Sequence, residues 1–181
     1  MVGGEAGYEI LGVDDFGTLV LTVIPRLRRY ARALTGDTLR ADDLVQDTLE
    51  RALTKRHLWR QGSDLRAWTF TIMHNVFVNQ IRARAADVAV AMEAEAFNIP
   101  SHTNPVDMLE IGDIDAALQR LPVDQREVLL LVALEQLTYS EAAQALGIPQ
   151  GTVMSRLFRA RERLRLLLDS APITGALKVV K

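Results

Sequence analysis

The sequence contains no cysteine and few histidines, and both scarcities limit its chemistry. Without cysteine the chain forms no disulfide, no thiolate metal site and no cysteine nucleophile. Its three histidines, His57, His74 and His102, stand at no spacing typical of metal ligands. Apolar runs stay well short of the ~18 residues that a membrane-spanning helix needs, so we expect no membrane insertion. We also expect no metal and no cofactor. Residues 1–15 carry acids rather than the basic start of a secretory signal, so we expect a cytoplasmic protein.

The chain does hold enough apolar residues for a core, together with an uneven distribution of charge. Its 181 residues are 49% apolar, which argues against general disorder and allows one ordinary domain or two small ones. The net charge of -2 conceals a basic segment at 17–87, with +5, and an acidic segment at 88–120, with -5. Five arginines oppose one glutamate within 156–165. Basic regions separated by an acidic one indicate two modules and a linker.

Helical periodicity predicts an all-α chain, because strand-like alternation is nearly absent. We expect helices at 19–34, 41–53, 65–86, 106–121, 123–135, 139–146 and 150–168. Pro25 should kink the first helix or reset its start, and Asp64 is suited to cap the third. Prolines at 100 and 105 mark a linker. The expected divisions are an N-terminal arm at 1–15, a small helical domain at 16–87, a flexible linker at 88–109, a second helical domain at 110–170 and a tail at 171–181.

The helix at 41–53 is amphipathic. Apolar residues recur at helical spacing from Ala41 to Leu53, so one face should be buried. The opposite face is polar and mostly acidic, and it consists of Asp42, Asp43, Gln46, Asp47 and Glu50. Carboxylates opposite an apolar seam suit a basic partner surface, although a merely solvated face is the simpler alternative.

A helix-turn-helix is predicted at 138–168. Thr138 and Glu141 fit a capping box, and Gly147 can adopt the left-handed conformation that ends the first helix. In the second helix one face is apolar, and the opposite face gathers Thr152, Ser155, Arg156, Arg159 and Arg163. Such a face suits the major groove, where arginine contacts guanine or phosphate. A charged helical face alone is more often solvated surface, but the turn in front of it favours DNA binding.

Four blocks of the sequence resemble the extracytoplasmic-function (ECF) sigma factors of bacterial RNA polymerase. Residues 42–52 resemble the segment that binds core polymerase, and residues 64–75 resemble the segment that follows it. Residues 121–128 resemble the start of sigma domain 4, and residues 147–161 resemble its recognition helix. The order of the blocks, without a domain 3 between them, is far more specific than any block alone. The resemblance covers about 17–168 and implies sigma domain 2 followed by a helix-turn-helix sigma domain 4.

This resemblance implies a promoter-specificity subunit rather than an enzyme. It would bind core RNA polymerase through the β′ clamp helices and the β flap, position it at the −35 and −10 elements and help to open promoter DNA. The residues that would dock on the clamp helices are Asp42, Asp43, Gln46, Asp47 and Glu50. An anti-sigma factor is the expected inhibitor.

The resemblance also assigns the −10 element to the loop at 58–63 and the helix after it, which capture a separated strand. Aromatic rings hold bases in such sites, and cations hold phosphates. The residues at the matching positions are Trp59, Arg60, Arg66, His74, Asn75, Phe77, Asn79 and Arg82. Trp68 also stands at a position that would contact the −10 strand, but it falls with Leu65 and Ile72 on the expected core stripe, so packing inside the domain is favoured.

The last helix would read the −35 element as duplex DNA. The residues implied are Ser155, Phe158 and Arg159 at base edges, Thr152 and Arg156 near phosphates, and Arg163 on the same face. Met154 replaces a Lys or Arg that is common in the family, so the −35 preference or affinity should differ. The acids expected to lie along the polymerase channel are Glu93, Glu95, Asp107 and Glu110.

Three other functions fit parts of the sequence. A sigma mimic that titrates an anti-sigma factor usually carries a receiver domain and lacks a basic recognition helix. An ordinary dimeric helix-turn-helix regulator leaves the blocks at 42–53 and 64–84 unexplained. A metal enzyme built on Asp42, Asp43, Asp47 and a histidine would need that histidine at a fixed spacing and a glycine-rich phosphate loop, and the sequence has neither.

Overall fold

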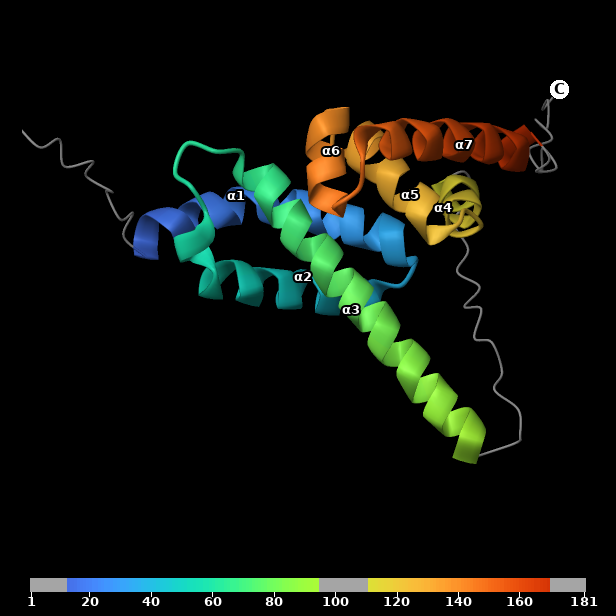
Figure 1. Ribbon diagram of the computed structural model, residues 1–181, viewed down its shortest axis with the longest axis horizontal. Coiled ribbons are helices and arrows are strands. Elements are labelled where there is room, and N and C mark those ends of the chain that lie inside the picture. The colour runs from blue at the N-terminus through green and yellow to red at the C-terminus, as the bar shows by residue number, and fades with distance from the viewer. Residues whose placement is uncertain (1–12, 95–110, 170–181) are drawn as a thin grey trace, which may run out of the picture.

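The computed structural model describes residues 13–94 and 111–169, and every regular element in these ranges is helical (Figure 1). The first helical domain consists of α1 (Val13–Thr35), α2 (Thr38–Thr54), the 3-10 helix η1 (Arg56–Leu58) and α3 (Leu65–Ala94). The second helical domain consists of α4 (Ile111–Gln119), α5 (Val123–Leu129), the π-helical turn η2 (Leu130–Leu134), α6 (Tyr139–Leu146) and α7 (Gln150–Asp169). The predicted all-α class is confirmed. The expected tail, most of the arm and most of the linker, with Glu95, Asp107 and Glu110, lie outside the described residues.

The first helix is longer than predicted, and Pro25 does not divide it. α1 begins at Val13 and continues through Pro25. Val23 and Leu27, on either side of the proline, are both buried, whereas Pro25 itself is exposed. Burial of one continuous apolar face outweighs the helical hydrogen bond that the proline removes.

α2 buries most of the predicted face, with Leu49 half-buried. Its buried residues are Ala41, Leu44, Val45, Thr48 and Ala52. Leu53, which we expected to join them, is 45% exposed. Consecutive helical residues point about 100° apart, so Leu53 lies at the edge of the face that Ala52 centres.

α3 runs beyond its predicted end near residue 86. It continues to Ala94, so the expected boundary between the first domain and the linker falls inside a helix. The segment after residue 85 is rich in alanine, the residue with the highest helix propensity, and this explains the extension. The final turns of α3 project beyond the other helices in Figure 1.

The helix predicted at 123–135 divides into two elements. α5 ends at Leu129, and the next five residues form the π-helical turn η2. Glu135 follows with its side chain fully buried, and Gln136 adopts a left-handed φ of 57°. π-helical turns are rare and concentrate at functional sites, so residues 130–134 are a candidate functional segment.

The helix-turn-helix forms as predicted. Thr138 and Glu141 make both hydrogen bonds of a capping box, α6 has the expected bounds, and Gly147 adopts a left-handed φ of 63° at its end. α7 extends one residue past its predicted end.

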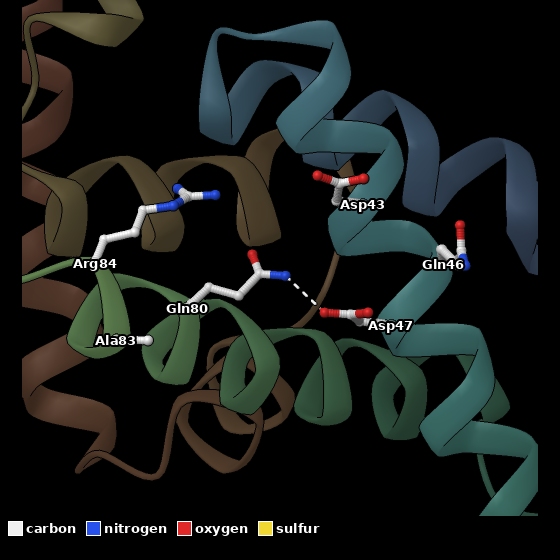
Figure 2. Close-up of a pocket in the computed structure, with 6 residues that line it drawn as sticks. All are labelled: Asp43, Gln46, Asp47, Gln80, Ala83 and Arg84. Atoms are coloured by element: carbon white, nitrogen blue, oxygen red, sulfur yellow. Dashed lines mark hydrogen bonds between the residues drawn. The ribbon is translucent and has the colours of Figure 1, made fainter. Parts of the chain in front are cut away.

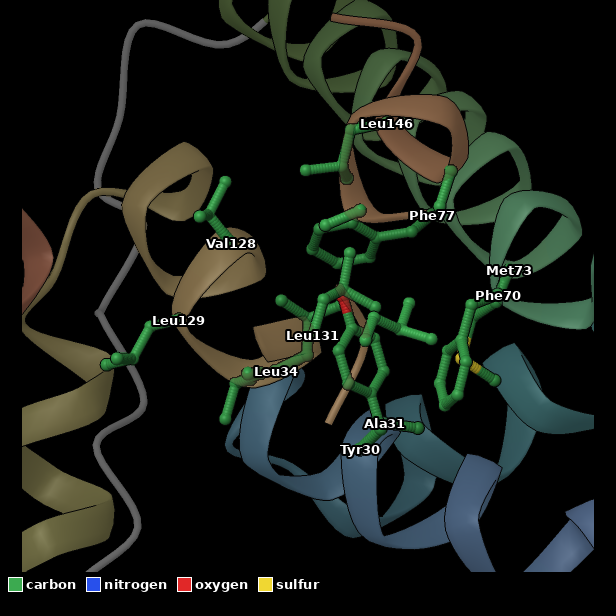
Figure 3. Close-up of a cluster of buried hydrophobic side chains, with 14 of the residues drawn as sticks. Tyr30, Ala31, Leu34, Phe70, Met73, Phe77, Val128, Leu129, Leu131 and Leu146 are labelled. Carbon is green, nitrogen blue, oxygen red and sulfur yellow. The ribbon is translucent and has the colours of Figure 1, made fainter. Parts of the chain in front are cut away.

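The two helical domains share one hydrophobic core (Figure 3). Tyr30 of α1 lies edge-on to Phe70 of α3, with ring centroids 5.0 Å apart. Leu131 and Leu146 of the second domain belong to the same buried cluster, as does Phe77. The sequence predicts two bodies joined by a tether, and the structure adds a direct interface between them.

Candidate nucleic-acid and protein interfaces

The acidic face of α2 is open to solvent along most of its length. Asp42, Asp43, Gln46 and Glu50 are exposed. Asp47 is half-buried, and its Oδ2 accepts a hydrogen bond of 2.8 Å from Nε2 of Gln80. The carboxylates of this face are therefore available to a basic partner surface, with Asp47 also bound within the domain.

A groove separates this acidic face from the middle of α3 (Figure 2). α2 contributes Asp43, Gln46 and Asp47, and α3 contributes Gln80, Ala83 and Arg84. Arg84 is the one cation among these lining residues, and it is exposed. The groove thus presents acidic and basic walls that lie on different helices.

The loop after α2 is held by an aromatic cluster. The rings of Phe16 and Trp59 lie 5.6 Å apart, and those of Phe16 and Trp68 lie 6.1 Å apart. Trp68 is half-buried and packs against Phe16, as its place on the core stripe predicts. Trp59 is half-buried, and its Nε1 is buried without a hydrogen-bond partner, whereas Arg60 next to it is exposed. Trp59 thus contributes to packing as well as to the loop surface.

Two residues expected to touch the −10 strand are covered by the second domain. Phe77 is only 6% exposed and belongs to the shared core. The His74 side chain is 17% exposed, and its Nδ1 lies 2.8 Å from Oε1 of Glu127. In this arrangement neither side chain is open to DNA, because α5 and α6 cover this part of α3. Their partners stand more than fifty positions away in the chain, so no local pattern signals the contact.

Three other expected −10 residues on α3 are reachable. Asn75, Asn79 and Arg82 are exposed. Nδ2 of Asn75 donates a hydrogen bond of 2.9 Å to the carbonyl of Thr71, within the same helix. These side chains lie along one solvent-facing part of α3, next to the residues that the second domain covers.

The recognition helix divides into the two predicted faces. Val153, Leu157 and Ala160 are buried against the rest of the second domain. Ser155, Arg159 and Arg163 are exposed, Thr152 is half-buried, and Phe158 is 68% exposed. Arg156 differs from the expectation, because its Nε lies 3.1 Å from Oδ2 of Asp124 and the side chain is only 28% exposed. That guanidinium is paired within the domain rather than free for a phosphate.

Polar contacts between the domains were not foreseen from the sequence. Nε2 of Gln119 donates to the carbonyl of Ala33, and a guanidinium nitrogen of Arg126 donates to the carbonyl of Leu34, at 2.9 and 2.7 Å. These carbonyls lie at the end of α1, where a helix has no partners of its own for them. The second domain therefore caps a helix of the first.

A second contact between the domains centres on Glu135. Its Oε1 accepts hydrogen bonds from Nε and a terminal nitrogen of Arg29, at 3.3 and 2.8 Å. Its backbone carbonyl accepts from Arg66 at 3.0 Å, which ties an expected −10 residue to the second domain. Burial raises the pKa of the nearby Tyr30 hydroxyl well above its usual value, and the charges of Glu127 and Glu135 raise it further.

Within the described ranges no three histidine, aspartate or glutamate side chains are grouped to share a metal ion. The metal-enzyme alternative has no ligand set in that part of the chain. None of the helices described there is both long and apolar enough to cross a bilayer.

The chain matches known proteins over both domains. Residues 20–74 match the family described as the Sigma2 domain of PhyR, and residues 111–164 match sigma-70 region 4. It is 42% identical over 155 residues to the ECF RNA polymerase sigma factor EcfG of Rhodopseudomonas palustris, covering 86% of each chain. It resembles the sigma factor RpoE from Bartonella quintana, solved with the anti-sigma factor NepR, at a TM-score of 0.74 and 37% identity, covering 87% of this chain and 99% of that one.

CnrH, solved with the cytosolic domain of CnrY, is similar at a TM-score of 0.65 and 28% identity, with 89% of this chain and 92% of that chain covered. The identity to EcfG extends over both domains and over 86% of that relative. The chain therefore belongs to the ECF sigma factors, the RNA polymerase subunits that direct the enzyme to promoters.

Proposed function

We propose that this sigma factor reads the −35 element with α7, reads the −10 element with the loop at 58–63 and α3, and docks on core RNA polymerase through the acidic face of α2. One observation carries this assignment: Ser155, Phe158 and Arg159 are exposed on the recognition helix, opposite its buried face. A helix exposed in this way behind a capped turn fits the major groove. Covalent chemistry is left to the polymerase.

The −10 step requires the domains to separate. Phe77 and His74 face the second domain, so a strand can reach them only after α5 and α6 have moved away from α3. Flipping and unstacking a base costs a few kcal/mol, which contacts with the newly uncovered residues would offset. The β′ clamp helices and the β flap are the polymerase surfaces that would hold the two domains apart.

We infer that an anti-sigma factor controls the chain. The similar RpoE was solved with the anti-sigma factor NepR, and CnrH with the cytosolic domain of CnrY. An inhibitor of this kind would bind the sigma factor in the cytoplasm, where its polymerase is.

A sigma mimic is the second candidate, and one observation favours it. Residues 20–74 match a family named for PhyR, which a solved complex describes as an anti-anti-sigma factor. The likeness to that PhyR structure is only 19% in sequence, so it concerns the fold alone. A mimic would bind an anti-sigma factor without directing transcription.

Transcription in vitro separates the two candidates. The purified chain is added to core polymerase on genomic fragments, and start sites are mapped. A sigma factor co-elutes with core polymerase and produces discrete starts that share −35 and −10 sequences. Reversal of charge at Asp42 and Asp43 should abolish co-elution, whereas Arg159→Ala should not. A chain that never co-elutes with core polymerase is not the proposed sigma factor.

A further inference from the structure

Three arginines of the first domain converge on one glutamate of the second. The Arg29 guanidinium contacts Oε1 of Glu135 at 2.8 Å, and a nitrogen of Arg26 lies 3.9 Å from Oε2. Arg66 binds the carbonyl oxygen of Glu135 from the start of α3. We propose that Arg26, Arg29 and Arg66 form a phosphate-binding site for the separated promoter strand, and that Glu135 occupies this site while the domains are packed together.

The site carries more positive than negative charge. Arg66 is already paired with Asp64 at 3.0 Å, so Arg26 and Arg29 share the single carboxylate of Glu135. Their side chains are 46% and 53% exposed, while Glu135 is completely buried between the domains. The positive charge in excess of Glu135 is therefore directed towards solvent, where an anionic strand can approach.

The carboxylate of Glu135 is not fully hydrogen-bonded in the site that it occupies. Its Oε2 is buried without a hydrogen bond, although a buried carboxylate normally has its oxygens satisfied. The turn that presents it follows the π-helical η2, and Gln136 takes a left-handed φ of 57° that side-chain-bearing residues rarely adopt. A carboxylate with an unsatisfied oxygen, on a strained turn, can be displaced by an anion that accepts more hydrogen bonds from the arginines.

A phosphodiester is the anion that this arrangement fits. Guanidinium groups bind phosphate through charge-assisted hydrogen bonds, and Oε1 of Glu135 already accepts two charge-assisted bonds from Arg29. Arg66 begins the helix that follows the loop at 58–63, so the three arginines continue the surface proposed for the −10 strand. This inference rests on the proposed function and names Arg26 and Arg29 as further DNA contacts.

The test measures binding of a fluorescent single-stranded oligonucleotide to the full chain over a series of salt concentrations. Glu135→Gln and Glu135→Ala should each bind the strand several-fold more tightly than the parent chain. Asp115→Asn removes the charge of an exposed aspartate on α4, outside the proposed DNA-binding surfaces, and this matched control should change nothing. Adding Arg26→Ala or Arg29→Ala to Glu135→Gln should remove the gain and reduce the slope of log affinity against log salt by about 0.7 for each lost phosphate contact.

The separation of the domains is followed in parallel. Because the chain has no cysteine, Leu39→Cys and Leu166→Cys, both at exposed positions, can carry a fluorescent pair without further changes. The Glu135 variants should show a longer distance between the labels, with unchanged helix content by circular dichroism.

Two results overturn the inference: Glu135 variants that bind the strand no better than the parent, or a gain that persists without Arg26 and Arg29. Start-site mapping with core polymerase distinguishes this failure from failure of the proposed function, since the parent chain would still direct transcription.

Discussion

Nδ1 of His74 lies 2.8 Å from Oε1 of Glu127, and this contact joins α3 to α5. The two side chains are 17% and 7% exposed, so the carboxylate has little access to water. The histidine expected to touch promoter DNA instead holds the second domain against the first. His74 therefore cannot contact Glu127 and promoter DNA at the same time.

Loss of this contact should weaken the packing of the domains. His74→Ala leaves Glu127 buried without its partner, and an unsatisfied buried group costs about 1–3 kcal/mol. Urea unfolding of the full chain should show this decrease in the free energy of unfolding. His57→Ala, at an exposed position, is the control and should stay within about 0.5 kcal/mol. Equal effects of the two substitutions would contradict a role for the His74 contact.

Substitution of Arg126 should lower the stability of the fold more than substitution of neighbouring arginines does. It is 7% exposed and donates hydrogen bonds to the carbonyls of Leu34, Gln119 and Leu121. Arg126→Met should lower the free energy of unfolding by about 2–3 kcal/mol, because buried carbonyls lose a charged donor. Arg120→Met, an exposed control in the same segment, should change stability by less than about 0.5 kcal/mol. A loss at Arg126 no larger than at Arg120 would show that the bonds contribute nothing.

Asp64 should stabilise the start of α3 in a pH-dependent way. Its Oδ1 accepts hydrogen bonds from the amides of Arg66 and Ala67. Partial burial raises the pKa of Asp64, but these bonds and the Arg66 guanidinium outweigh it and hold the pKa below the usual value. A depressed pKa means that the stabilisation is complete above the unfolded-state pKa, about 3.9, and is lost as the pH falls through the folded-state value.

Asp64→Ala should therefore lower the free energy of unfolding by about 1 kcal/mol at neutral pH, as loss of an N-cap does. The difference from the parent should shrink on acidification through the pKa range of Asp64, measured by urea unfolding at several pH values. Asp64→Asn keeps a capping oxygen and should retain most of the stability. A difference independent of pH would exclude the charged cap as its source.

Arg159 should affect promoter reading without affecting polymerase binding. It is exposed on α7, and its Nε donates to the carbonyl of Ser155 in the same helix. A good bidentate contact with a base discriminates by about 1–3 kcal/mol, so Arg159→Ala should reduce −35-dependent transcription by about 5- to 150-fold. Arg161→Ala, on the same helix but outside the proposed −35 face, is the control. A parallel loss of co-elution with core polymerase would contradict the assignment.

Met154 and Phe158 should make thymine methyl groups part of the −35 preference. They are 52% and 68% exposed at positions i and i+4, on the flank of Ser155 opposite Arg159. Apolar side chains in the major groove recognise the thymine methyl group. Replacing a contacted thymine by uracil removes only that methyl, which is worth about 0.8 kcal/mol or a three- to fourfold loss in binding. Met154→Lys should reduce this sensitivity, and equal affinity for the two bases would exclude the contact.

Local patterns predicted the elements whose signals are local. Thr138, Glu141 and Gly147 specify the ends of α6 through hydrogen bonds and backbone conformation within a few residues, and the structure places them as expected. The exposed and buried faces of α2 and α7 follow from helical spacing alone. The π-helical turn was missed, because residues 130–134 have the local pattern of an ordinary apolar helix.

The sequence by itself determined the helical class, the order of the main helices and the chemistry of the polar faces of α2 and α7, since each depends on neighbours within a turn or two. Only the tertiary structure decided which of those side chains are free. Phe77, His74 and Arg66 are covered or bound by groups from the second domain, and Arg156 is paired with Asp124 of another helix. Such contacts depend on the relative placement of helices far apart in the chain, and no spacing within one segment encodes it.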